Sequence, residues 1–126
     1  MINNIKESYC NFEEAKLLKK KGFDDLNKGY YVWMYDGDGE IVKEKLGYQN
    51  DWFIIRPTRA LAIKWFKENF GIHIYIEPVI VEDAIKYDWV ILSKNFETED
   101  FDNILYNTFE EATEAAILHT LKNLIP

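Results

Sequence analysis

The fold class is decided by residues 57–78, which read PTRALAIKWFKENFGIHIYIEP. Up to Gly71, apolar residues recur at helical spacing behind the N-cap candidate Thr58, which predicts an amphipathic helix. After Gly71, isoleucine takes every second position, which predicts a half-buried strand that ends at Pro78. The residues assigned to the two buried faces are Ala62, Ile63, Phe66 and Phe70 of the helix and Ile72, Ile74 and Ile76 of the strand. A helix that passes directly into such a strand indicates a mixed fold.

Two further helices are predicted from capping signals on either side of this stretch. Asn11 is an acceptable N-cap with Glu14 three residues later, and Gly22 ends the helix. Thr108 and Glu111 form the same capping pattern near the C-terminus. The protein is therefore expected to contain three helices.

The remaining apolar runs have the two-residue period of strands. They predict a hairpin in the first half, a central strand that is apolar on both faces, and a short edge strand before the last helix. The bounds are Tyr30–Tyr35 and Glu40–Leu46 for the hairpin, Tyr87–Ser93 for the central strand and Phe101–Tyr106 for the edge strand, with residues 95–100 in a loop. We therefore predict a single α+β domain over residues 1–126, in which three helices pack on one antiparallel sheet of four to five strands in the order αββαββ(β)α.

The composition is that of a globular protein. The 126 residues are 48% hydrophobic, with only 6 Gly and 3 Pro, which argues against a disordered chain. The longest apolar run, Tyr30–Tyr35, is too short to cross a bilayer, and no apolar stretch follows Met1 as in a secretory leader. The single cysteine, Cys10, cannot form an internal disulfide. We therefore expect a cytoplasmic protein with no membrane contact.

Charge is unevenly spread along the chain. Residues 1–71 hold 12 Lys/Arg and 11 Asp/Glu, a sum of +1, whereas residues 72–126 hold 3 Lys and 11 Asp/Glu, a sum of -8. An acidic half repels phosphate backbones, so binding to duplex nucleic acid is not expected. Four acids that lie close together are the candidate docking site for a basic partner protein, with solubility as the alternative explanation: Glu97, Glu99, Asp100 and Asp102.

Three stretches of the chain resemble one group of proteins. They are Tyr9–Asp24, which reads YCNFEEAKLLKKKGFD; Arg56–Phe66 followed by Gly71–Ile74; and Thr108–Ala112 with Ala115–Ala116. They resemble the opening, middle and end of small uncharacterised proteins encoded by tailed phages and prophages. The resemblance implies an accessory protein made in the cytoplasm of a host cell, and it supplies no catalytic residues.

A histidine provides the only hint of catalysis. His73, Tyr75 and Glu77 alternate with the isoleucines, so they share the opposite face of that strand. Such a row beside a cleft would suit acid–base chemistry or nucleotide binding. No nucleophile stands at a motif spacing from it, and no phosphate-binding loop is present. A small enzyme or nucleotide-binding protein is therefore the alternative function, and a surface histidine is the plainer interpretation.

No metal or cofactor site is predicted. Residues 36–40, DGDGE, begin like a calcium loop, but Ile41 and Gly47 stand where that loop needs its glycine and its bidentate glutamate. A hairpin turn explains the stretch without a metal. The possible zinc ligands are too scattered along the chain, since they are Cys10, His73 and His119.

Aromatic residues make up 16% of the chain, and three of them alternate along the first strand. Tyr31, Trp33 and Tyr35 share one face of that strand, and the other face holds Tyr30, Val32 and Met34. Either the strand is buried on both faces, or one face is an exposed patch that contacts a partner protein or a second copy of the chain. An acidic, aromatic-rich chain without catalytic motifs is expected to be a non-enzymatic protein-interaction module.

Overall fold

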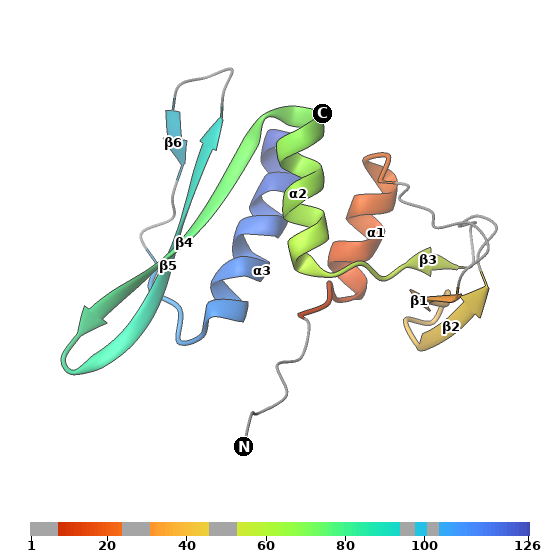
Figure 1. Cartoon of the computed structure of the whole chain (residues 1–126), viewed down its shortest axis with the longest axis horizontal. Helices are drawn as coiled ribbons and strands as arrows, with labels where there is room; N and C mark the ends of the chain where they lie inside the picture. The colour runs from red at the N-terminus through yellow and green to blue at the C-terminus, as the bar shows by residue number, and fades with distance from the viewer. Residues whose placement is uncertain (1–7, 24–30, 46–52, 94–97, 101–103) are drawn as a thin grey trace.

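The computed structural model describes residues 8–23, 31–45, 53–93, 98–100 and 104–126. Within them the chain forms three α-helices and two antiparallel sheets, which confirms the predicted α+β class (Figure 1). The elements in chain order are α1 (Phe12–Lys20), β1 (Tyr31–Tyr35), β2 (Ile41–Lys45), β3 (Ile54–Ile55), α2 (Arg59–Phe70), β4 (Ile72–Val81), β5 (Ala84–Ser93), β6 (Thr98–Asp100), α3 (Phe109–His119) and the π-helical turn η1 (Thr120–Leu124), which continues α3.

All three predicted helix starts are confirmed, because each is set by a local capping contact. The side chains of Asn11, Thr58 and Thr108 accept a hydrogen bond from the backbone amide three residues further on, at 2.9, 3.1 and 3.1 Å. At Asn11 the capping box is complete, since its own amide donates to the Glu14 carboxylate at 2.8 Å. Gly71 ends α2 at a φ of 66°, a left-handed conformation that glycine adopts without steric cost.

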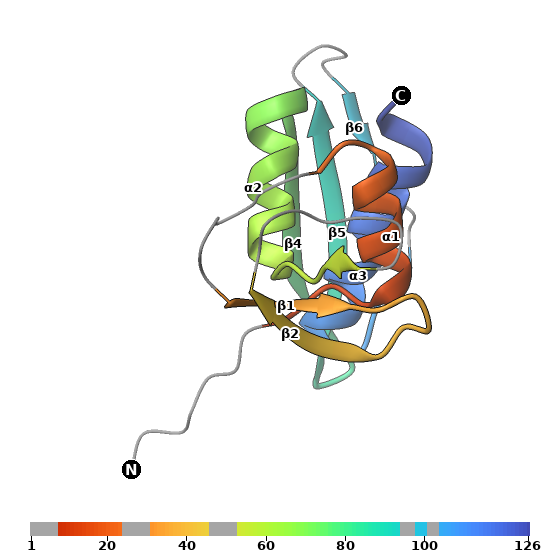
Figure 2. The ribbon, with the colours of Figure 1, turned by 90° about the vertical axis from the view of Figure 1, so that its right-hand side faces the viewer.

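The described strands form two sheets of three strands each, in place of the predicted single sheet of four to five. In the first sheet β1 pairs with β2 and with β3, and in the second β5 pairs with β4 and with β6. The helices lie between the two sheets, so the backbone of one sheet does not reach the other (Figures 1 and 2). The short strand β3, which has no counterpart in the prediction, adds a strand to the first sheet.

Pro78 does not end the strand that it was expected to end. β4 continues through it to Val81 and stays paired with β5. Opposite Pro78 lies Tyr87, whose backbone amide and carbonyl bond Tyr106 on the far side of β5. Facing residues in an antiparallel ladder either exchange both hydrogen bonds or point both sets of groups outward. The missing N–H of Pro78 therefore lies on the outer edge of β4, where it costs no bond to β5.

The strand after β5 also differs from the prediction. Residues 98–100, expected in a loop, form β6. Of the expected edge strand at 101–106, the described residues begin at Ile104, and Tyr106 makes one isolated bridge to Tyr87. β5 lies between β4 and β6, which confirms its predicted central position.

The helices α2 and α3 cover one face of the β4–β5–β6 sheet (Figure 1). The predicted apolar faces lie on this side, where Ile72 is 3% exposed and Trp89 and Ile91 are buried. The main hydrophobic core joins residues from all three helices and both sheets. Its largest fully buried side chains are Trp89, Phe23, Phe66, Leu18, Met34, Ile91, Ile117 and Leu121.

Candidate functional site

The β4–β5 hairpin projects beyond the helices that cover the rest of its sheet (Figure 1). We call its closed end, residues 78–87, the arm. Ile80 and Ile85 face each other across the two strands of the arm, and they are 80% and 57% exposed. Because side chains alternate along a strand, the pair continues the face on which Ile72 is buried. The arm therefore extends an apolar sheet face into solvent without the helices that bury it elsewhere.

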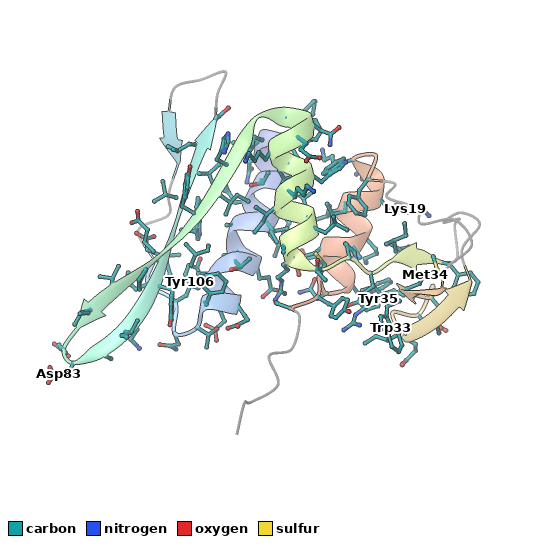
Figure 3. The ribbon with its side chains drawn as sticks, viewed as in Figure 1. Lys19, Trp33, Met34, Tyr35, Asp83 and Tyr106 are labelled. Atoms are coloured by element: carbon teal, nitrogen blue, oxygen red, sulfur yellow. The ribbon has the colours of Figure 1, made fainter. Side chains whose placement is uncertain are left out.

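The turn at the tip of the arm is conformationally demanding. Glu82 and Asp83 connect Val81 to Ala84 in a two-residue loop, and their φ angles are 49° and 66°. Positive φ at both central residues suits a right-twisted hairpin, but Asn-Gly is the usual choice for it. A non-glycine residue pays about 1–2 kcal/mol for this conformation. Asp83 lies at the far end of the arm, away from the helices (Figure 3).

The base of the arm is fastened to the start of α3. The backbones of Tyr87 and Tyr106 exchange two hydrogen bonds, at 2.8 and 2.7 Å. The ring of Phe109 meets the ring of Tyr87 edge-on, with 6.2 Å between centroids. The Lys86 ammonium donates to the Asn107 side-chain oxygen. The arm is thus attached on one side to the rest of the fold, while its isoleucines are exposed.

Ile80 and Ile85 were not among the predicted site residues, although the sequence holds a signal for them. The isoleucine alternation that starts at Ile72 resumes at Ile80 beyond Pro78, and it is mirrored by Ile85 after Glu82-Asp83. This continuation was missed because the strand was predicted to end at Pro78. A proline is compatible with a strand when it lies on an edge.

His73, Tyr75 and Glu77 lie on the opposite face of β4, as the alternation predicts. Their cross-strand partners on β5 are Leu92, Val90 and Asp88. Tyr75 and Glu77 are exposed and His73 is half-buried. The helices cover the other face of this sheet (Figure 1). The enzymatic or nucleotide-binding alternative at these residues stays a prediction, and none of the three lines either of the cavities described below.

The aromatic face of β1 is buried at one end and open in its middle. Tyr35 is 6% exposed, and its hydroxyl donates to the Cys10 carbonyl at 2.5 Å. Met34, on the opposite side of the strand, is 1% exposed, so this end is buried on both faces (Figure 3). Trp33 is 42% exposed. The side chain of Tyr31 lies outside the described residues.

The four clustered acids are only partly described. The backbones of Glu99 and Asp100 belong to β6, opposite Leu92 and Ile91 of β5, and their side chains are not described. Glu97 and Asp102 lie outside the described residues. The expected role of these four acids in docking a basic partner stays a prediction. β6 is separated from β4 by β5, so this segment lies across the sheet from the outer edge of β4.

A buried ion pair joins α1 to α2. The Glu14 carboxylate is fully buried and accepts hydrogen bonds from the Arg59 guanidinium, the shortest at 2.8 Å. Arg59 also donates to the Ser8 hydroxyl at 3.1 Å, and Asn11 donates to Glu114. The helical spacing holds a signal for this burial, since Glu14 precedes the buried Leu18 by four residues and so shares its face.

Burial and ion pairing oppose each other in setting the pKa values of this cluster. Loss of solvent raises the pKa of the Glu14 carboxyl, although hydrogen bonds from Arg59 and the Asn11 amide oppose the rise. Desolvation would lower the pKa of the Arg59 guanidinium, but the hydrogen bond and charge of Glu14 raise it overall. Burial and the charge of Glu14 raise the pKa of the Cys10 thiol, so Cys10 is a core side chain and not a reactive thiolate.

The cavities offer little chemistry. One of 180 Å³ is lined by Ser8, Arg59, Ala60, Ile63, Phe109 and Thr113, and its guanidinium is already engaged by Glu14. Another, of 390 Å³, lies beside Gly71 and the C-terminal Pro126. Among the described residues no three His, Cys, Asp or Glu side chains gather as a metal site would require, and no helix is long and apolar enough to cross a membrane.

The arm is therefore the strongest candidate for a functional surface, because its apolar pair is exposed and nothing within the described chain covers it. Its location on a projecting hairpin and its demanding turn set it apart from the scattered exposed residues elsewhere. Comparison with known proteins gives no relative to set beside it, since no family model, no curated protein and no solved structure matches this chain.

Proposed function

We propose that the protein is a non-enzymatic interaction module that binds another protein through the arm. The observation that carries the proposal is the Ile80–Ile85 pair, which is 80% and 57% exposed on a hairpin that projects from the fold. Exposed apolar patches on small proteins mark contact sites more often than isolated apolar residues do. Fastening of the arm to α3 lowers the entropy that a partner must remove on binding.

An accessory role in a phage or prophage is part of this proposal, and its support is the sequence resemblance. We also propose that the acids Glu97, Glu99, Asp100 and Asp102 bind a basic partner, with salt-sensitive association as the expected property. Self-association through the arm is the alternative that the same observation allows, because the occupant of an exposed apolar surface can be a second copy.

Site-specific photo-crosslinking tests the proposal. A photoreactive amino acid is placed at Ile85, and a matched control carries it at Glu68, an exposed position on α2. We expect a discrete covalent adduct from position 85 in cells that contain the natural partner and none from position 68. Mass spectrometry of the adduct identifies the partner or a second copy of the chain. Equal labelling from both positions, or none from position 85, would reject the arm as the binding surface.

A further inference from the structure

The chemistry of the arm indicates what kind of partner it takes. The register of β4 and β5 places Ile80 and Ile85 on one face with Pro78 and Tyr87. Phe109, 49% exposed, extends this face to the first residue of α3 through its ring contact with Tyr87. We call these five residues the docking face. It is an apolar surface that runs from the arm to the helix.

Carboxylates border the docking face at both ends. Glu82 and Asp83 form the tip of the arm, and Glu110 and Glu111 follow Phe109 in the first turn of α3, where all four are exposed. Within the described part of the chain none of the four forms an ion pair. The positive end of the α3 helix dipole stabilises Glu110 and Glu111. Glu82 and Asp83 are not at a helix N-terminus, and they occupy a turn where asparagine and glycine are preferred.

The edges of the arm limit how a partner binds. The outer edge of β4 lacks a donor at Pro78, and the far edge of β5 is occupied at Tyr87 by Tyr106. Addition of a partner strand to either edge is therefore interrupted within the arm. Contact through side chains on the docking face is not restricted in this way.

We propose that the docking face binds a basic amphipathic segment of a partner protein, in which apolar side chains cover Ile80 and Ile85 and Lys or Arg side chains pair with the bordering carboxylates. This inference rests on the proposed function and adds the chemistry of the partner to it. A second copy of the chain fits less well, because the basic helix α1 already buries its apolar residues Ala15 and Leu18 in its own core. Charge complementarity of this kind speeds association and selects among partners.

Titration with two synthetic helical peptides tests the chemistry of the partner. One is an amphipathic Leu/Lys peptide and the other is its Leu/Glu counterpart of equal length. We expect the Leu/Lys peptide to shift the amide NMR signals of residues 79–87 and 109–111, with binding that weakens as salt is added. The Leu/Glu peptide should bind at least about tenfold more weakly, which corresponds to a difference of about 1.4 kcal/mol in binding free energy.

Variants of the intact chain assign the contacts. Ile80→Thr removes apolar surface and should weaken the Leu/Lys peptide about tenfold. The fourfold variant Glu82→Gln, Asp83→Asn, Glu110→Gln, Glu111→Gln should weaken it and flatten its salt dependence. The matched control neutralises four exposed carboxylates elsewhere and should leave the affinity within about twofold; these are Glu13, Asp38, Glu40 and Glu68.

The outcomes separate the two proposals. Equal binding of both peptides at the docking face would overturn the basic partner and leave the arm as a docking site. Leu/Lys binding that maps elsewhere, or that Ile80→Thr does not change, would overturn the inference about the docking face. The crosslinking experiment uses the natural partner and no peptide. A negative crosslinking result therefore rejects the arm as a binding surface whatever the two peptides do.

Discussion

Glu14 and Ile80 each lie in an environment that is unusual for their residue type, one buried and the other exposed. Glu14 is an acid with a fully buried side chain, and Ile80 is an apolar residue that is 80% exposed. Acids are rarely buried unless paired, and single exposed apolar residues are common, but a projecting exposed pair is not. We therefore expect each of the two side chains to have a contact that offsets its unfavourable environment.

The two positions differ in where that contact is found. Glu14 is compensated inside the chain, by Arg59 and by the amide of Asn11. Ile80 has its cross-strand neighbour Ile85, and at 80% exposed it is covered by no helix of the described chain. A buried acid that is paired within the fold therefore has a structural role. An exposed apolar residue that no other part of the fold covers indicates a surface that binds another molecule. Four substitutions test this distinction.

The largest effect is expected at the compensated site. Arg59→Ala leaves the buried Glu14 carboxylate without its guanidinium and should lower the free energy of unfolding by about 3–5 kcal/mol. Lys64→Ala is the control, because it breaks an exposed pair with Glu68 that is worth less than about 1 kcal/mol. Urea unfolding measures both. Similar losses in the two variants would show that the Glu14–Arg59 pair does not behave as a buried pair.

A pH dependence should accompany the buried carboxylate. Because burial raises the pKa of Glu14, the stability linked to its proton is complete below the ordinary value of 4.5 and is lost as pH rises through the folded-state pKa. Glutamine does not titrate, so the stability of Glu14→Gln relative to the parent should increase from pH 4.5 to neutrality. Urea unfolding at a series of pH values measures this difference. Glu13→Gln, at the exposed neighbouring position, controls for the lost charge.

A relative stability of Glu14→Gln that decreases with rising pH would contradict the direction assigned to the Glu14 pKa. It would indicate that the hydrogen bonds from Arg59 outweigh desolvation.

A glycine in the turn of the arm should stabilise the fold. Asp83→Gly removes the steric cost of a φ of 66° and should raise the free energy of unfolding by about 0.5–1 kcal/mol. Asp83→Ala loses the same charge but keeps a Cβ and has no preference for positive φ, so it separates charge from conformation. Thermal unfolding of both variants gives the comparison. A gain in Asp83→Ala equal to that in Asp83→Gly would assign the cost to charge and not to the backbone.

The smallest effect on stability is expected at Ile80. Because its side chain is 80% exposed and threonine keeps the β-branch, Ile80→Thr should change the free energy of unfolding by less than about 0.5 kcal/mol. Ile72→Thr on the same strand buries a hydroxyl at a position that is 3% exposed and should cost about 1–3 kcal/mol. Equal losses at the two positions would mean that Ile80 stabilises the fold and has no need of a partner.

The candidate site was only partly predictable from the sequence. The alternation along β4 correctly placed His73 on the face opposite the isoleucines. It could not show that Ile80 is 80% exposed, because the length of a hairpin relative to the helices over it is a property of the packed structure. The pairing of Glu14 with Arg59 joins residues far apart in the chain, so only the position of Glu14 on a buried helical face was available as a signal.

The sequence by itself determined the three helix starts and the class of the fold. Asn11, Thr58 and Thr108 cap their helices by bonding an amide three residues away, and Gly71 ends α2 by its own backbone freedom, so these features need only neighbouring residues. The tertiary structure alone decided that the strands divide into two sheets with helices between them, that Pro78 lies on an outer edge, and that the arm extends past its cover. Strand pairing and side-chain burial depend on which distant elements pack together, and a local pattern carries no information about that choice.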